Sequence, residues 1–267
     1  MAKNRAEVWR KYLLGDYETI LQQRKMYHNI IIHHPYEIDS EISRQIKADI
    51  PRTTLVHDNV CLSDKRQKIV ESLLVQYVQI MPCDGYLQGF NYIMALLYDV
   101  YVKQDVEHAL ADTWWSMVAI VSVMRPMIPD HDPHDFERYT RKWSVYYKNH
   151  LRLKNNRLYI LLEPHLATIL PMITVKWLMI WFTQLFALDE IKIVWDALIT
   201  CDSKHRTKLM AIIAANITIQ QGHAIEKWAR ECPSEVGGRL YQARATDATV
   251  IIEQSRLSMI QYKLPVL

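Results

Sequence analysis

The strongest structural signal in this 267-residue chain is Asp64-Lys-Arg-Gln-Lys-Ile-Val-Glu-Ser-Leu-Leu-Val-Gln-Tyr-Val-Gln-Ile80. Its apolar side chains recur every three or four residues, which places them on one face of an α-helix. Ser63 or Asp64 is available to cap the first free N–H groups of that helix. The pattern therefore predicts an amphipathic helix over residues 64–80, packed on one side against other helices.

Helical spacing continues beyond this segment. The run Tyr92 to Val102 is almost wholly apolar and predicts a central helix, and Ala109 to Met124 predicts another. Both Pro126 and Pro129 follow, and proline stops a helix. Sustained alternation with a period of two residues, the mark of half-buried strands, is not found. We therefore predict an all-α fold.

The composition indicates one compact domain over residues 1–267. Half of the residues (50%) are apolar, enough for a large core, and only 6 are glycine, which argues against a flexible tether. The prolines after Met124 mark a boundary inside this domain. We expect an amino-terminal lobe of about residues 1–126 and a carboxy-terminal lobe of about residues 127–267.

Charge and cysteine content argue against two classes of protein. The 32 basic residues nearly balance the 29 acidic ones, whereas a nucleic-acid-binding domain carries a clustered basic face. The four cysteines lack the paired spacing of a disulfide framework or a zinc site, and they suit a reducing compartment. We therefore expect a cytoplasmic protein without a nucleic-acid partner.

A long apolar run, Ile169 to Leu188, approaches the length of a membrane span. Lys176 interrupts it, and a lysine near the centre of a span costs about 2.5–3.5 kcal/mol on insertion scales. Pro171 shortens the usable helix further. A buried core helix is the favoured interpretation, without direct membrane insertion, and a membrane helix is the alternative.

Two short segments flank the predicted helix at residues 64–80. The first, Ile46-Lys-Ala-Asp49-Ile-Pro-Arg52-Thr53, places an arginine beside a proline, and the second, Gly85-Tyr86-Leu-Gln88-Gly89-Phe-Asn91, places a glutamine between glycines. Such residues bend the backbone, so both side chains can reach outward. GTP hydrolysis needs this pair, because a guanidinium stabilises phosphate charge and an amide orients the attacking water. Taken singly, Arg52 also suits a surface ion pair and Gln88 a solvated cap.

These motifs resemble those of the TBC domain, the catalytic domain of GTPase-activating proteins for Rab GTPases. The family's I-x-x-D-x-x-R and Y-x-Q-G motifs are matched by Ile46, Asp49 and Arg52, and by Tyr86, Gln88 and Gly89. The family's opening helix is matched by Arg5, Trp9 and Leu13-Leu14-Gly15. Its later W-F-x-x-L-F signature is matched by Trp181 to Phe186, and its W-D signature by Trp195-Asp196. The motifs follow one another in the family's order along nearly the whole chain.

The resemblance implies a two-lobed helical fold and an enzyme activator, not a self-contained hydrolase. Arg52 and Gln88 would be the catalytic residues, inserted in trans into the nucleotide pocket of a Rab-family small GTPase. Asp49 would orient Arg52, Tyr86 would brace Gln88, and Gly89 would let the backbone come close to the partner. No cofactor of the protein's own is implied, because GTP and Mg²⁺ belong to the partner.

The same resemblance leaves a second hypothesis open. A module with this fold would bind a Rab or a scaffold protein without accelerating hydrolysis. At two positions this chain has Leu87 and Phe90, where the family commonly has small or flexible residues. We expect these two side chains to need room beside Arg52 and Gln88. That need would restrict which GTPases can bind. Recruitment to endomembranes would follow from the Rab partner, and the sequence indicates no oligomeric state.

The segment Asp130-His131-Asp132-Pro-His134-Asp135 carries side chains that divalent metals bind. Pro133 and the close spacing make convergence of these side chains on one ion awkward. A polar loop between the lobes is therefore the favoured interpretation, and no metal site is expected.

Overall fold

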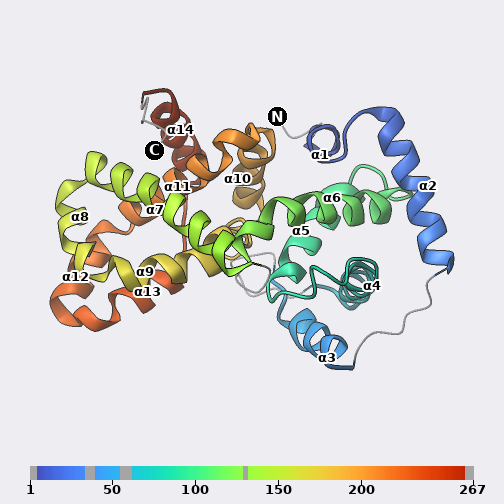
Figure 1. The fold of residues 1–267 in the computed structure, drawn as a ribbon, viewed down its shortest axis with the longest axis horizontal. Helices are drawn as coiled ribbons and strands as arrows, with labels where there is room; N and C mark the ends of the chain where they lie inside the picture. The colour runs from blue at the N-terminus through green and yellow to red at the C-terminus, as the bar shows by residue number, and fades with distance from the viewer. Residues whose placement is uncertain (1–4, 34–39, 55–61, 129–131, 262–267) are drawn as a thin grey trace. The chain divides into compact units, whose positions relative to one another are not determined.

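The computed structural model describes residues 5–33, 40–54, 62–128 and 132–261 (Figure 1). Contacts between Cα atoms divide the chain into two compact units, residues 1–125 and residues 126–267. In the described ranges every regular element is a helix. The all-α prediction is therefore confirmed.

The first unit is a helical layer built around α5. Its elements are α1 (Arg5–Leu13), α2 (Tyr17–His33), α3 (Ser40–Asp49), the 3₁₀ turn η2 (Ile50–Arg52), α4 (Asp64–Ile80), α5 (Phe90–Val102) and α6 (Ala109–Met124). A further 3₁₀ turn, η3 (Arg125–Met127), follows α6. The predicted helices at residues 64–80 and 109–124 have these bounds, and the third begins two residues earlier than predicted.

Helix α5 is the core of this unit, because it packs against both α4 and α6 (Figure 1). Its side chains Ile93, Met94 and Leu97 are fully buried. Helix α4 turns Leu73 and Leu74 inward, as its spacing predicts. Ser63 stands at the N-cap of α4, but its side chain makes no cap hydrogen bond. Packing of the apolar face therefore holds α4 in place, more than capping does.

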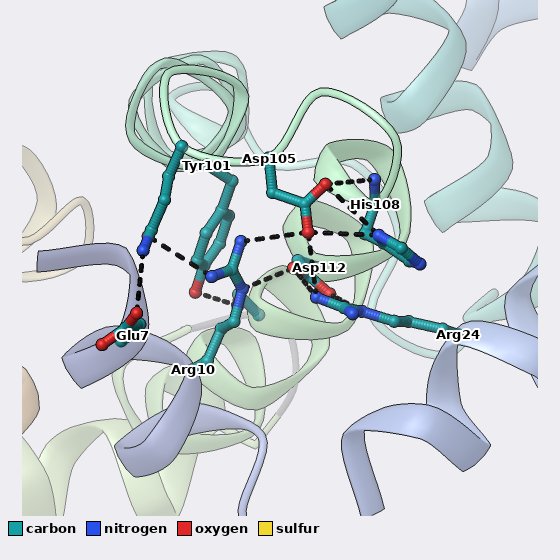
Figure 2. A network of polar contacts seen from close by, with 9 residues as sticks. Glu7, Arg10, Arg24, Tyr101, Asp105, His108 and Asp112 are labelled. Atoms are coloured by element: carbon teal, nitrogen blue, oxygen red, sulfur yellow. Dashed lines mark hydrogen bonds and ion pairs between the residues drawn. The ribbon is translucent and has the colours of Figure 1, made fainter. Parts of the chain in front are cut away.

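A buried carboxylate connects α1 and α2 to α6 (Figure 2). Asp112 of α6 is 1% exposed, and it accepts hydrogen bonds from Arg10 Nε at 2.6 Å and from Arg24 Nη2 at 2.7 Å. Asp105, in the turn before α6, lies 3.6 Å from Arg24 Nη2 and accepts a hydrogen bond from the backbone N–H of His108. Two guanidinium groups thus converge on one buried anion, which fixes how the first two helices lie on α6.

The second unit consists of residues 126–267. Its elements are α7 (Pro133–Lys154), α8 (Asn156–Leu162), η4 (Glu163–His165), α9 (Leu166–Ile173), the π-helical turn η5 (Thr174–Leu178), α10 (Leu188–Thr200), α11 (Ser203–Gln220), α12 (Gly222–Glu231), η6 (Pro233–Glu235), α13 (Val236–Gln242) and α14 (Ala248–Gln261). Helix α11 is central here, because α7, α10 and α14 all pack against it (Figure 1).

A chain of buried polar groups runs through the core of this unit. His150 of α7 donates from Nε2 to Asn216 Oδ1 of α11 at 2.8 Å, and Asn216 Nδ2 donates to Ser255 Oγ of α14 at 2.9 Å. His150 is fully buried, and this burial lowers its pKa; the hydrogen bond to Asn216 raises the pKa in part, and the charge of Lys154 lowers it further. The imidazole is therefore neutral in the folded protein near neutral pH.

The prediction of one core helix over residues 169–188 was wrong in its extent. The helical stretch 156–178 is long and apolar enough to cross a membrane, and 39% of its most apolar part is buried inside the protein. Beyond residue 178 the chain leaves the helix, because Trp181 and Phe182 have φ angles of 49° and 64°. Trp195 Nε1 donates to the carbonyl of Trp181 at 2.9 Å, so the later tryptophan motifs build the core of this unit.

We expect Asp112→Ala to lower the free energy of unfolding by about 3 kcal/mol, because Arg10 and Arg24 lose their buried partner. Urea denaturation measures this. Glu137→Ala is the control, since its ion pair with Arg141 is exposed and should contribute less than about 1 kcal/mol. Equal losses in the two variants would show that the Asp112 network carries no special weight.

We also expect acid to weaken the protein through His150. Its folded-state pKa lies below the ordinary value of 6.5, so the unfolded chain binds the proton more readily. The stabilisation is complete above pH 6.5 and is lost as pH falls from there towards the folded-state pKa. His150→Gln, which does not titrate, should show a smaller drop in melting temperature between pH 7.5 and 5.5. An unchanged drop would contradict this assignment.

Candidate functional site

The arginine segment, residues 49–53, forms a tight turn at the end of α3. Ile50 is buried at 3% exposure, and the N–H of Thr53 donates to its carbonyl at 3.0 Å, which closes the 3₁₀ turn. Pro51 lies in the first positions of this turn, where its missing N–H costs nothing. Ile50 and Thr53 therefore anchor the segment, while Arg52 between them is exposed.

The glutamine segment, residues 85–92, leads into α5. Gly85 and Gly89 have φ angles of 61° and 112°, in the region where side chains other than glycine are strained. Gly89 is the N-cap of α5, and its carbonyl accepts from the N–H of Tyr92 at 3.0 Å. Gln88 is exposed and immediately precedes this cap, as the sequence predicts. Gly89 itself is buried, and its positive φ angle makes the left-handed turn into α5.

A hydrogen bond between side chains joins the two segments. The hydroxyl of Tyr86 donates to Asp49 Oδ2 at 2.9 Å. Burial raises the pKa of the Tyr86 hydroxyl above its ordinary value, and the carboxylate of Asp49 raises it further. Tyr86 therefore stays protonated and remains a donor to Asp49. Asp49, which we expected to orient Arg52, thus accepts its hydrogen bond from Tyr86 of the glutamine segment.

Two further contacts link the same segments. Asn91 Nδ2 donates to Thr53 Oγ1 at 2.8 Å, and both side chains are buried. The hydroxyl of Tyr92 donates to the backbone carbonyl of Arg52 at 3.1 Å. The backbone of Arg52 is thus held directly from the first turn of α5, while Arg52 itself is exposed.

The turn that precedes the glutamine segment is also fixed. The hydroxyl of Tyr77 on α4 donates to Asp84 Oδ2 at 2.7 Å, and Arg125 Nε donates to Asp84 Oδ1 at 2.8 Å. The side chain of Asp84 is 1% exposed. Such a paired, buried carboxylate is costly to disrupt, so Gly85 and the residues after it start from a rigid position.

Phe90 does not need room beside Arg52 and Gln88, and that expectation was wrong. Its ring is fully buried, with edge-to-face contacts to Tyr77 and Tyr86 at centroid distances of 6.1 and 6.3 Å. An aromatic ring at the first position of a buried helix gains more from core packing than from the surface.

The side chains of Arg52 and Gln88 make no hydrogen bond or ion pair with the part of the chain that the structure describes. Both are exposed. The hydroxyl of Tyr92 donates to the backbone carbonyl of Arg52, and the buried side chain of Asn91 bonds to Thr53 and Gly89, which follow Arg52 and Gln88 in the chain. A guanidinium fork and an amide on a fixed backbone can bind an anionic group of a docked molecule without first breaking internal bonds.

The predicted polar segment at residues 130–135 is described only from Asp132 onward. Asp132 is the N-cap of α7, and its Oδ1 accepts from the backbone N–H of His134 at 2.8 Å. His134 and Asp135 therefore begin a helix rather than a loop. In the described ranges no group of three or more His, Cys, Asp or Glu side chains is placed to hold a metal.

Three residues of the site were not singled out in the sequence: Thr53, Asn91 and Tyr92. Their signal is weak, because each is a common residue type. An amide in the first turn of an apolar helix is the clearest hint, since a buried polar side chain requires a partner. The identity of that partner depends on a contact 38 residues away in the sequence.

Similarity to known proteins identifies a family. Residues 2–224 match the family model described as "Rab-GTPase-TBC domain". Over 177 residues the chain is 25% identical to "Growth hormone-regulated TBC protein 6" of Caenorhabditis elegans, covering 61% of this chain and 46% of that protein. Over 159 residues it is 26% identical to human "TBC1 domain family member 13", covering 58% and 39%. The chain thus spans less than half the length of these curated relatives.

A solved structure shares the fold. The structure titled "Crystal structure of the Ypt/Rab-GAP domain of Gyp1p" matches with a TM-score of 0.73, covering 97% of this chain and 89% of that one. The two sequences are 15% identical, so this likeness concerns the fold alone.

We expect Tyr86→Phe to lower the free energy of unfolding by about 1.5–3 kcal/mol, because the half-buried carboxylate of Asp49 loses its donor. Urea denaturation measures the loss. Tyr159→Phe is a matched control, since the hydroxyl of Tyr159 donates to Glu163 at 3.0 Å at an exposed position and should contribute little. If both variants lose the same amount, the bond to Asp49 does not join the segments as described.

Proposed function

The chain belongs to the Rab-GTPase-TBC domain family, and from that premise we propose that it is a GTPase-activating protein for a Rab-family small GTPase. Arg52 and Gln88 supply the catalytic groups in trans. The protein is then an activator, because the nucleotide and its Mg²⁺ belong to the partner.

One observation carries this proposal. Two exposed side chains of the required chemistry stand on two segments that hydrogen bonds join: the hydroxyl of Tyr86 donates to the carboxylate of Asp49, and the hydroxyl of Tyr92 donates to the backbone carbonyl of Arg52. Because the two segments are joined in this way, the guanidinium of Arg52 and the amide of Gln88 can enter the same pocket of a partner. Residues on independent loops would first have to be ordered, at a cost in conformational entropy.

The proposed chemistry is electrostatic. In the transition state of GTP hydrolysis, negative charge spreads over the phosphate oxygens, and an arginine supplied in trans accelerates the reaction by about 10³ to 10⁵. The amide of Gln88 would orient the attacking water, the role usually played by a glutamine of the GTPase itself. Docking of the two proteins would exclude bulk water and strengthen both contacts.

The proposal has a cellular consequence. Acceleration of GTP hydrolysis returns a Rab protein to its GDP-bound state and so ends its signal in vesicle traffic. We expect the protein to act in the cytoplasm, at the endomembrane that carries its Rab partner.

We expect Arg52→Ala to abolish acceleration and Gln88→Ala to reduce it by about 10² to 10³, the usual loss for one transition-state donor. Single-turnover GTP hydrolysis by a panel of Rab proteins measures this and identifies the target. Arg138→Ala is the control, because Arg138 is an exposed arginine of the second unit, paired with Asp135.

The panel also separates the two hypotheses. Acceleration by the native chain and by Arg138→Ala, lost in the other two variants, supports catalysis. Binding to a GTP-loaded Rab without acceleration supports the silent module instead. Acceleration that survives both Arg52→Ala and Gln88→Ala would reject the residue assignment while leaving the activity in place.

A further inference from the structure

A single buried amide touches the neighbours of both proposed catalytic residues. Asn91, in the first turn of α5, is 2% exposed. Its Oδ1 accepts from the backbone N–H of Gly89 at 3.1 Å, and its Nδ2 donates to Thr53 Oγ1 at 2.8 Å. Gly89 follows Gln88 in the chain, and Thr53 follows Arg52.

The bonds continue beyond Thr53. Its hydroxyl donates to the backbone carbonyl of Asp49 at 3.1 Å, while it accepts from Asn91. The donors therefore follow one direction, from the N–H of Gly89 through Asn91 and Thr53 to Asp49. Hydrogen bonds in such a chain polarise and strengthen one another, and Thr53 is fully buried, so solvent does not compete.

We propose that Asn91 is a positioning residue that fixes the spacing between Arg52 and Gln88. This inference rests on the proposed function, and it adds a residue that contacts neither nucleotide nor GTPase. Its amide bridges the arginine segment to the glutamine segment at the two positions next to the catalytic residues. Without it, the buried Thr53 hydroxyl and the N–H of Gly89 lose partners, and the two segments are free to move apart.

A purely structural role for Asn91 is the competing explanation, and the chain offers a matched control. Asn216 is also a buried amide, 6% exposed, and it also uses both of its side-chain polar atoms, in hydrogen bonds to the side chains of His150 and Ser255. It lies in the second unit, away from the proposed catalytic residues in sequence. Asn91→Leu and Asn216→Leu both remove one buried amide of similar size, so both should lower stability.

The first measurement needs no GTPase. Spin labels on Arg52→Cys and Gln88→Cys, in the 267-residue chain with its four native cysteines replaced by alanine, report the distance between the two positions by pulsed electron paramagnetic resonance. We expect a narrow distance distribution in the parent and with Asn216→Leu, and a broad one with Asn91→Leu. A distribution that stays narrow with Asn91→Leu overturns the proposal, whatever the activity.

The second measurement is kinetic, on the chain without labels. We expect Asn91→Leu to lower the kcat of GTP hydrolysis by about 10²-fold, the effect of misplacing a catalytic group by about 1 Å. The KM for the GTP-loaded partner should stay nearly unchanged, since the docking surface is intact. Asn216→Leu should keep the native kcat, and a native kcat with Asn91→Leu overturns the proposal.

If Asn91→Leu does not fold, Thr53→Val takes its place in both measurements, because it removes only the hydroxyl that Asn91 contacts. Thr53→Ser keeps that hydroxyl and should restore the native kcat and the narrow distribution. A native chain that accelerates no Rab protein rejects the proposed function. Broadening with Asn91→Leu would then still support the amide bridge, so the two failures are distinguishable.

Discussion

The hydrogen bond from the hydroxyl of Tyr86 to the carboxylate of Asp49, 2.9 Å long, joins two segments that are separated in the chain by the whole of α4. Each segment is a short turn, and these bonds tie the two turns to each other as well as to the helices beside them. The hydrogen bonds between the arginine segment and the glutamine segment hold the two in a fixed relation to each other. The proposed chemistry requires this, since a cation and an amide act together only if their backbones are fixed relative to each other.

The rest of the first unit holds the arginine and glutamine segments in place. Helix α5 is buried along almost its whole length, so its first turn is a rigid base for Asn91 and Tyr92. Helix α4 contributes Tyr77, which holds both Phe90 and Asp84. The polar side chains of Asn91 and Thr53 are buried and bonded to each other, while Arg52 and Gln88 remain exposed. Function on exposed turns that a packed scaffold positions is a common arrangement in proteins.

Local sequence patterns were enough to predict part of this structure. The helices over residues 64–80 and 109–124 follow from apolar spacing and from the prolines and glycines that end them. The exposure of Arg52 and Gln88 follows from the turns around them. The bridge through Asn91 could not be predicted, because a hydrogen bond between residues 38 positions apart leaves no local pattern. The predicted helix over residues 169–188 was too long for a similar reason. The turn at Trp181 is held by a hydrogen bond from Trp195, which lies 14 residues further along the chain.

The proposed mechanism is tested most directly by a structure of the chain bound to its Rab target, loaded with GDP and aluminium fluoride, which mimics the phosphoryl group in transit. We expect a complex that requires the fluoride, with the guanidinium of Arg52 and the amide of Gln88 both in contact with the mimic. A complex in which another face of the chain covers the nucleotide, or in which only one of these side chains reaches it, would refute the mechanism.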